Sequence, residues 1–293
     1  MKILILGSEG FVGNNLVDGL SKNHQIICGD VLESSIHNNY HQVNITNLES
    51  VNKITQNVDV IIDLVAHSLT SSLNGSIENA EINIIGLLNI LESCRTNNVK
   101  KIIFTSASSL IGEPKSYSVS ENHIPTPKTA YGITKLASEH YLRLYFELYG
   151  INYTIFRFFN IYGPYQKNGL IPTLYKKIIE NQPITVFGKG DQVRDYVFIE
   201  DIIPFFDIAS STKTGENSIF NMGTGKGTTI LEIINMISNN LKVKPDVEFN
   251  PPRPGEIGNF VSDTTNHEKI FNQIPNTPVD QGLAKTIDWL KQH

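Results

Sequence analysis

The sequence predicts an α/β fold, in which a doubly wound parallel sheet of the Rossmann type carries a smaller C-terminal α/β substrate lobe. Short apolar runs rich in Ile and Val alternate with longer segments of helical periodicity through the first half of the chain. A glycine-rich loop follows the first apolar run. After about Asn160, many Gly and Pro residues divide the chain into short pieces, which indicates a smaller lobe.

The apolar runs predict strands that are buried on both faces, because they are nearly continuous in apolar character and do not alternate with polar residues. Repeated strand–helix–strand order then implies a parallel sheet with right-handed crossovers. The expected strands are Lys2–Leu6, Gln25–Gly29, Val58–Ala66, Lys100–Ser106 and Tyr153–Phe158. The expected helices are Gly10–Leu20, Leu48–Thr55, Ile77–Cys94 and Ala130–Leu148.

The change of texture near residue 160 divides the chain into two parts. We expect a dinucleotide-binding domain over residues 1–163 and a substrate-binding lobe over residues 164–293. The division leaves room for the chain to re-enter the main domain within the second range. A length of 293 residues is enough for one large core with such an appended lobe.

Composition narrows the class of protein. Hydrophobic residues make up 40% and charged residues 18%, as in ordinary globular domains. The net charge is −5, from 24 basic and 29 acidic residues, and no Lys/Arg run stands out. Nucleic-acid and anionic-membrane partners are therefore not expected. No apolar stretch reaches the roughly 18 residues of a membrane span, and the N-terminus is too short for a signal peptide, so a cytoplasmic location is expected.

The two cysteines, Cys28 and Cys94, lie in apolar segments and are expected to be buried free thiols. The sequence contains no C-x-x-C pair and no His/Cys cluster at metal-binding spacing, so no metal site is expected.

The loop 7–13 (GSEGFVG) predicts a dinucleotide site. Its glycines, Gly7, Gly10 and Gly13, are spaced G-x-x-G-x-x-G between an expected strand and an expected helix. Such glycines allow a tight turn, let the backbone approach a pyrophosphate, and let the helix pack close to the strand. The helix N-terminus then faces the phosphate charge.

Asp30 predicts the choice of cofactor. It ends the second expected strand, some twenty residues after the glycine loop. A carboxylate there accepts hydrogen bonds from the adenosine ribose hydroxyls and repels the extra phosphate of NADP. No Arg or Lys follows within ten residues. NAD is therefore the expected cofactor.

Tyr131 and Lys135 form a candidate catalytic pair. They are four residues apart at the start of the helix expected over Ala130–Leu148, so they share one helical face. A phenol with its ordinary pKa of ~10 is a poor base at neutral pH, but neighbouring cations favour the phenolate. Lowering its pKa to ~7 requires roughly 4 kcal/mol, which an ammonium and a cationic nicotinamide can supply together.

These motifs resemble those of the extended short-chain dehydrogenase/reductases. The resemblance rests on G-x-x-G-x-x-G, on Y-x-x-x-K, and on later segments that follow in family order over nearly the whole chain. The later segments are 157–164 (RFFNIYGP), 190–197 (GDQVRDYV), 221–225 (NMGTG) and 253–256 (RPGE) followed by Asp263. Within that family the chain is most similar to the nucleotide-sugar epimerases, of which UDP-glucose 4-epimerases are the type example.

The resemblance implies a role for each matching position. Tyr131 would be the catalytic base, and Lys135 its electrostatic partner and a ribose contact. The implied cofactor contacts are Gly7, Gly10, Phe11, Val12, Gly13, Asp30, Asn44, Ile45, Leu64, Val65, Ala66, Asn83, Tyr131, Lys135 and Phe159. The implied substrate contacts are Asn160, Arg194, Arg253 and Phe260. Arginine suits that role because its planar guanidinium pairs with phosphate oxygens.

One position departs from the family pattern. The family carries a catalytic Ser or Thr at the end of the strand expected over Lys100–Ser106, and counting back from Gly112 places Ala107 there. Ser106 or Ser108 could supply the hydroxyl, although neighbours on a strand point to opposite faces. Sugar dehydratases carry an Asp-Glu pair directly after the catalytic Thr, whereas this chain has Ser108-Ser109. Water elimination is therefore less favoured than epimerisation or reduction.

The resemblance implies an NAD-dependent isomerase of carbohydrate metabolism that epimerises UDP-glucose and UDP-galactose at C4 through a 4-keto intermediate. A reductase or dehydratase of the same family remains an alternative, and so does a dinucleotide-sensing protein without catalysis. The two long helices around Ile77–Cys94 and Ala130–Leu148 resemble those that pair subunits in this family, which implies a homodimer. Phe260 matches a position that limits the space around the sugar 2-substituent, which favours glucose and galactose over their N-acetylated forms.

Overall fold

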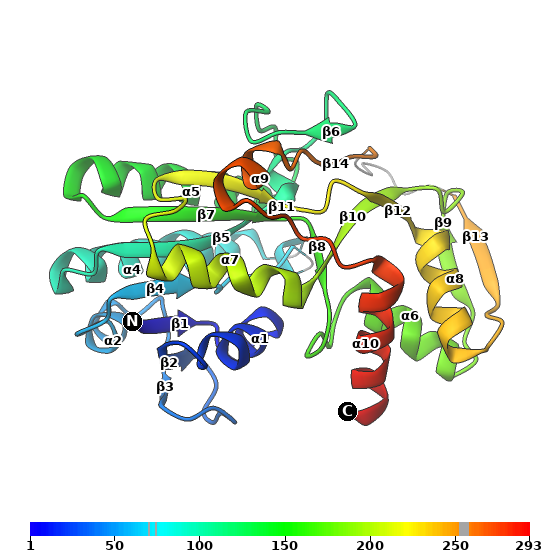
Figure 1. The fold of residues 1–293 in the computed structure, drawn as a ribbon, viewed down its shortest axis with the longest axis horizontal. Helices are drawn as coiled ribbons and strands as arrows, with labels where there is room; N and C mark the ends of the chain where they lie inside the picture. Colours follow the sequence, from blue (N-terminus) through cyan, green and yellow to red (C-terminus); the bar gives the residue numbers. More distant parts are fainter. Residues whose placement is uncertain (70, 74, 252–257) are drawn as a thin grey trace.

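The computed structural model describes residues 1–69, 71–73, 75–251 and 258–293. Its centre is a parallel seven-stranded sheet in the order β11-β7-β5-β4-β1-β2-β3, with helices on both faces (Figure 1). This confirms the predicted doubly wound fold. The strands are β1 (Lys2–Leu6), β2 (Gln25–Asp30), β3 (Tyr40–Gln42), β4 (Val60–Asp63), β5 (Lys101–Ala107), β7 (Asn152–Phe158) and β11 (Ser218–Met222).

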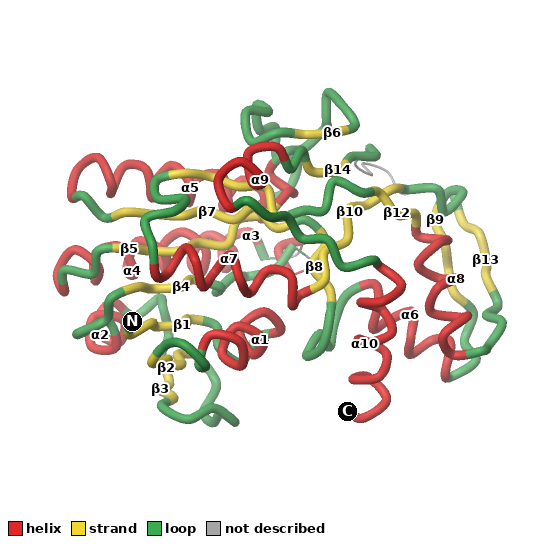
Figure 2. The backbone as a smooth tube through the Cα atoms, viewed as in Figure 1, coloured by secondary structure: helices red, strands yellow, loops and turns green. Residues whose placement is uncertain are grey.

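Two apolar layers hold this sheet. One layer lies under α1 (Phe11–Leu20) and α7 (Ile199–Ser211), and the other under α2 (Leu48–Ile54), α4 (Gly86–Asn97) and α5 (Ala130–Tyr149). The strands β1 and β5 are buried almost end to end, which explains the apolar runs at residues 3–6 and 102–104. The tube view shows helices on either side of the strands (Figure 2).

The C-terminal part forms a smaller α/β region beside the sheet (Figure 1). Its sheets pair β12 with β10, β10 with β8, β13 with β9, and β14 with β6. These strands are β6 (Ser118–Val119), β8 (Asn160–Tyr162), β9 (Ile184–Phe187), β10 (Val193–Phe198), β12 (Gly227–Thr229), β13 (Val247–Asn250) and β14 (Val261–Ser262). The helices of this part are α6 (Leu170–Ile179), α8 (Ile230–Leu241), α9 (Thr265–Phe271) and α10 (Val279–Gln292).

The chain re-enters the main sheet after residue 163. Strand β11 pairs in parallel with β7, from Ser218 beside Thr154 to Met222 beside Phe158. Helix α7 contacts α1 and β5, so it belongs to the layers of the main sheet as well.

Several expected bounds were wrong for identifiable reasons. The strand expected over Val58–Ala66 is only β4, because the Asp63 side chain accepts a hydrogen bond from the Val65 N–H at 3.1 Å and turns the chain. Strand β3 was missed because its three residues are polar and mostly exposed. The helix expected over Ile77–Cys94 is interrupted: α3 (Ser76–Ala80) continues through a π-helical turn, η2 (Glu81–Ile85), into α4.

Local sequence signals fix the helix that carries the candidate catalytic pair. The Thr129 hydroxyl caps the N-terminus of α5 by accepting from the Gly132 N–H at 3.1 Å. The helix ends at Tyr149, and Gly150 follows as its C-cap with a left-handed φ of 69°, which glycine adopts at no steric cost. Helix α5 therefore begins one residue before Tyr131, which holds Tyr131 and Lys135 on its first turns.

Candidate active site

The glycine loop between β1 and α1 forms an anion cradle. Gly7 has a φ of +83°, and a Cβ built on Gly13 would lie 2.2 Å from the Gly7 carbonyl oxygen. Only glycine therefore fits at Gly13, and the close approach brings the start of α1 against the end of β1. Gly10 caps α1 without a side chain, and the first turn of that helix carries no acidic residue. Its backbone N–H groups are thus suited to a phosphate.

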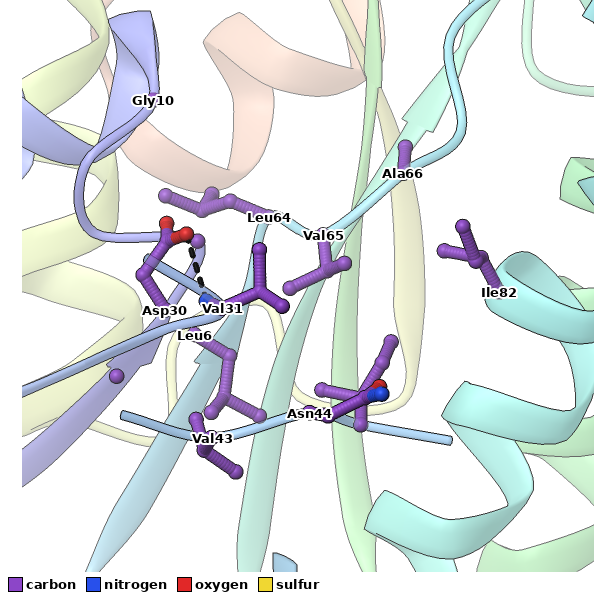
Figure 3. A pocket seen from close by; sticks show the side chains of 13 residues that line it. Leu6, Gly10, Asp30, Val31, Val43, Asn44, Leu64, Val65, Ala66 and Ile82 are labelled. Atoms are coloured by element: carbon purple, nitrogen blue, oxygen red, sulfur yellow. Dashed lines mark hydrogen bonds between the residues drawn. The ribbon is translucent and has the colours of Figure 1, made fainter. Parts of the chain in front are cut away.

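A cavity of about 310 Å³ opens beside this cradle at the carboxyl ends of β1, β2 and β4 (Figure 3). Asp30 lies on its rim, where its carboxylate accepts from the Val31 N–H at 2.7 Å and from the Glu9 N–H at 3.1 Å. The structure thereby brings together eight of the residues expected at the cofactor: Gly7, Gly10, Asp30, Asn44, Ile45, Leu64, Val65 and Ala66. A crevice at the strand ends is where α/β sheets bind ligands.

A second cavity of about 370 Å³ adjoins the first and shares Leu64 and Ala66 with it. It collects the remaining expected residues near the end of β5 and the start of α5. Those lining it are Phe11, Val12, Ser106, Ser108, Tyr131, Lys135, Phe159 and Asn160. Gly13 and Asn83 line neither cavity and lie behind the cavity walls. The two cavities adjoin at Leu64 and Ala66, and together they are called the crevice below.

Lys135 is buried and lies against the sheet. Its ammonium donates to the Thr105 carbonyl at 2.7 Å and stands 4.5 Å from the centre of the Phe104 ring and 5.7 Å from that of Tyr131. Burial lowers the pKa of Lys135 to about 8, against the opposing effect of the Asp63 and Glu139 carboxylates. Burial also raises the pKa of Tyr131 to about 12. Tyr131 is therefore a phenol in the free protein at neutral pH.

Asn83 fixes the turn of α5 between the two catalytic candidates. From the π-helical turn its amide donates to the Thr134 hydroxyl at 3.0 Å, and its carbonyl oxygen accepts from the His67 N–H at 2.8 Å. Thr134 in turn donates to Asn79 at 2.9 Å. π-Helical turns are frequent at functional sites, and this one joins α5 to the segment after β4. Asn83 thus lies behind the site and orients it.

The two serines proposed for the missing hydroxyl occupy different surroundings. The Ser106 hydroxyl donates to Glu139 at 2.7 Å, and Glu139 is held by Arg157 through bonds of 2.7 and 2.9 Å, all of them buried. The Ser106 hydroxyl is therefore held in a buried hydrogen-bonded cluster with Glu139 and Arg157. Ser108 begins the short 3₁₀ turn η3 (Ser108–Leu110) and lines the cavity beside Tyr131.

Ser109 was not singled out by the sequence. It lines the same cavity as Tyr131, and its buried hydroxyl has no hydrogen-bond partner among the described residues. A buried hydroxyl without a partner is costly unless a ligand satisfies it. The signal available in the sequence was its place in the Ser108-Ser109 pair, where dehydratases carry carboxylates.

The expected substrate contacts flank the second cavity. The Asn160 amide donates to the Asp195 carbonyl at 3.1 Å, and Arg194 lies on the adjacent strand β10. The Asp195 carboxylate accepts from the N–H groups of Thr224, Gly225 and Ser262 at 2.8 to 3.0 Å. Asp195 therefore fixes the backbone next to Arg194. Arg253 lies outside the described residues.

Phe260 is buried, with 6% of its surface exposed, just before β14. Its ring packs edge to face on Phe159 at 5.7 Å between centroids. Since Phe159 lines the cavity that contains Tyr131, Phe260 backs the wall of that cavity.

Comparison with known proteins agrees with this geometry. The family model for the NAD dependent epimerase/dehydratase family matches residues 3–223. The chain belongs to this family. It is 32% identical to a putative UDP-glucose 4-epimerase of Methanocaldococcus jannaschii, over 99% of both chains.

Two solved structures are similar to this chain. One is a UDP-glucose 4-epimerase of Thermotoga maritima with UDP-glucose, with a TM-score of 0.93, 30% identity, and coverage of 100% of this chain and 99% of that one. The other is a UDP-glucuronic acid 4-epimerase of Bacillus cereus with UDP-glucuronic acid and NAD, with a TM-score of 0.91, 30% identity and the same coverage.

Membership of this family makes the protein a nucleotide-sugar epimerase-family enzyme with NAD as its cofactor. The resemblance stated from the sequence motifs is confirmed. Among the helices of the described residues, none is long and apolar enough to cross a membrane.

Asp30 predicts that the protein binds NAD in preference to NADP. NAD should bind at least tenfold more tightly than NADP, a difference of about 1.4 kcal/mol, because a 2′-phosphate would face the Asp30 carboxylate. Calorimetric titration with each cofactor measures the two affinities, and Asp30→Asn should reduce the difference between them. Equal affinities in the unsubstituted protein would rule out Asp30 as the discriminating residue.

Proposed function

We propose that the protein is an NAD-dependent 4-epimerase that interconverts UDP-glucose and UDP-galactose through a 4-keto intermediate. One observation carries the proposal. Tyr131 and Lys135 line a cavity that shares Leu64 and Ala66 with the cofactor cavity, and Asn160, an expected substrate contact, lines it too. The similar proteins from T. maritima and B. cereus act on UDP sugars, which supports a UDP-linked substrate here.

The proposed chemistry is redox-neutral proton and hydride exchange at C4 of the sugar. Bound NAD supplies a reversible hydride acceptor. The Tyr131 oxygen takes the proton of the sugar 4-hydroxyl and returns it after the keto sugar has turned over. Moving the pKa of Tyr131 from about 12 to neutrality corresponds to roughly 7 kcal/mol, so the Lys135 ammonium must act together with further positive charge.

The carboxylates near the site argue against dehydration. Among the described residues, those that line the Tyr131 cavity include no Asp or Glu. Glu113 pairs with Lys128 at 2.8 Å on the surface, and Glu139 is buried against Arg157. Water elimination needs a free acid and base beside the sugar, which these side chains do not provide.

Two other candidate functions, a reductase and a dinucleotide sensor, can be distinguished from an epimerase. A reductase would use the same Tyr131 and Lys135 but would consume reduced cofactor in proportion to product. A dinucleotide sensor has no need of a buried ammonium beside a tyrosine, since burying that charge costs stability. Retention of this costly pair favours an enzyme.

Replacing Tyr131 with Phe tests the base directly. The ring stays and only the proton acceptor is lost, so NAD should still bind while turnover of UDP-galactose falls by roughly 10² or more. Steady-state kinetics with calorimetric control of NAD affinity measures both. Near-native turnover in Tyr131→Phe would place the base elsewhere.

The preference for glucose and galactose rests on the cavity wall. Phe260 and Phe159 form a large aromatic pair where an N-acetyl group would need space. Among the described residues, Lys135 is the only basic side chain that lines the cavity, and it faces Tyr131. The described lining thus offers no free cation to pair with the carboxylate of glucuronic acid, which favours a neutral hexose.

The Phe260→Ser substitution tests the size limit. We expect the unsubstituted enzyme to have a higher kcat/KM for UDP-galactose than for UDP-N-acetylgalactosamine, and Phe260→Ser to shift that ratio toward the acetylated sugar by roughly tenfold, the effect of a pocket enlarged by a few methylenes. Kinetics with both sugars, and with UDP-glucuronic acid as a third, measures the ratios. A native preference for the acetylated or acidic sugar would contradict this assignment.

A second copy of the chain is the partner we propose for the outer face of α5. Ile133, Leu144 and Leu148 lie on one stripe of this helix and are 42% to 60% exposed. Ile77 on the neighbouring α3 and Ile85 at the end of η2 are exposed as well. Exposed apolar residues gathered on neighbouring helices in this way are typical of an association site, and a homodimer would cover them.

Sedimentation velocity tests the dimer. We expect a dimer at micromolar concentration and a monomer after Leu148→Glu, because a charge on the apolar stripe would have to be buried without a partner. Phe249→Glu on β13 serves as the control, since Phe249 is also exposed (57%) but lies in the C-terminal part. A stable native monomer would exclude this interface.

A further inference from the structure

Strand β4 ends in a buried carboxylate. Its sequence is VIID, and Asp63 is only 2% exposed among apolar neighbours. One carboxylate oxygen accepts from the Val65 N–H at 3.1 Å. Burying an ionised carboxylate costs free energy unless it is paired. Asp63 therefore needs an explanation beyond packing.

The sheet register directs Asp63 toward Lys135. Asp63 pairs with Phe104 on β5, and paired residues of parallel strands point to the same face. The Lys135 ammonium stands 4.5 Å from the Phe104 ring centre on that face. Thr105 lies between the two residues, since its main-chain carbonyl accepts from the Lys135 ammonium at 2.7 Å and its hydroxyl donates to the main-chain carbonyl of Asp63 at 3.1 Å.

This arrangement stabilises neither the ionised Asp63 carboxylate nor the Lys135 ammonium relative to water. Burial raises the pKa of Asp63 to about 6, although Lys135 and the Val65 N–H oppose the rise. Burial likewise lowers the pKa of Lys135 to about 8. Both charged forms are thus disfavoured relative to water, and among the described residues Lys135 has no ion pair within 4.0 Å. Perturbed, imperfectly paired groups in a crevice indicate function more than stability.

The other titratable groups around Lys135 are already accounted for. Helix α5 presents Tyr131, the proposed base, and Glu139, which is bound to Arg157 and Ser106. Helix α4 presents Cys94, a buried thiol whose pKa is raised by burial and by Asp63. Among the described residues, Asp63 is thus the carboxylate that faces Lys135 without a cation of its own.

We propose that Asp63 is a positioning residue that sets the pH range in which the Lys135–Tyr131 pair exchanges its proton, while it holds Val65 at the cofactor cavity. This inference rests on the proposed function of Tyr131 and Lys135. Because Lys135 and Tyr131 interact, they lose their first proton as a pair, with one apparent pKa. The negative charge of Asp63 raises that apparent pKa, so removing it should lower it.

The Asp63→Asn variant isolates the charge, because an amide oxygen still accepts from the Val65 N–H. We expect the whole pH profile of kcat to move to lower pH by about one unit, with KM for the UDP sugar nearly unchanged. Asp63→Glu keeps the charge and should keep the native profile even if kcat falls. Asp59→Asn is the matched control, since Asp59 is exposed before β4, accepts from the Lys2 N–H at 2.8 Å, and should shift nothing.

A measurement without turnover separates this inference from the proposed function. The tyrosinate ultraviolet absorbance of the protein minus that of its Tyr131→Phe variant reports the titration of Tyr131. With Asp63→Asn that titration should move to lower pH, whether or not a UDP sugar is epimerised. If neither the titration nor the profile moves, Asp63 only accepts a hydrogen bond and the inference is overturned. If the titration moves but no sugar is converted, the proposed function fails and the coupling stands.

Discussion

The buried ammonium of Lys135 is the constraint around which the crevice is arranged. It sits over the Phe104 ring, 2.7 Å from a strand carbonyl, and faces the carboxylates of Asp63 and Glu139. An ammonium in such a place costs free energy, which the two apolar layers of the sheet must offset. The buried position of Lys135 places a positive charge close to Tyr131, where solvent does not screen it.

The parallel sheet makes this arrangement possible. Its strand ends place the glycine cradle, Asp30, Asp63 and the serines after β5 along one edge. Helix α5 crosses the same edge because Thr129 caps it one residue before Ala130. The π-helical turn with Asn83 then ties α5 to the segment after β4. Each of these contacts lies on an element whose position follows from the sheet.

The sequence indicated the parts of this arrangement that rest on short-range patterns. Apolar strands, the glycine loop and Y-x-x-x-K each lie within a few residues. The loop and the helix that carries Y-x-x-x-K formed where expected, whereas β4 is shorter than its expected range. Contacts made through the third dimension could not be predicted in this way. The commitment of Ser106 to Glu139 depends on a helix 33 residues later, and the return of β11 depends on pairing with β7. Asp63 gave a signal, an ionisable residue in an apolar strand, but its neighbour Lys135 appears only in the fold.

The most direct test of epimerisation follows the sugar itself. Purified protein is incubated with UDP-galactose and NAD, and the products are observed by proton NMR while the absorbance of reduced cofactor is recorded. We predict conversion to UDP-glucose, the same final mixture from either sugar, and no net reduced cofactor, because the proton and hydride are both returned. No interconversion, or reduced cofactor that accumulates in step with product, would contradict it.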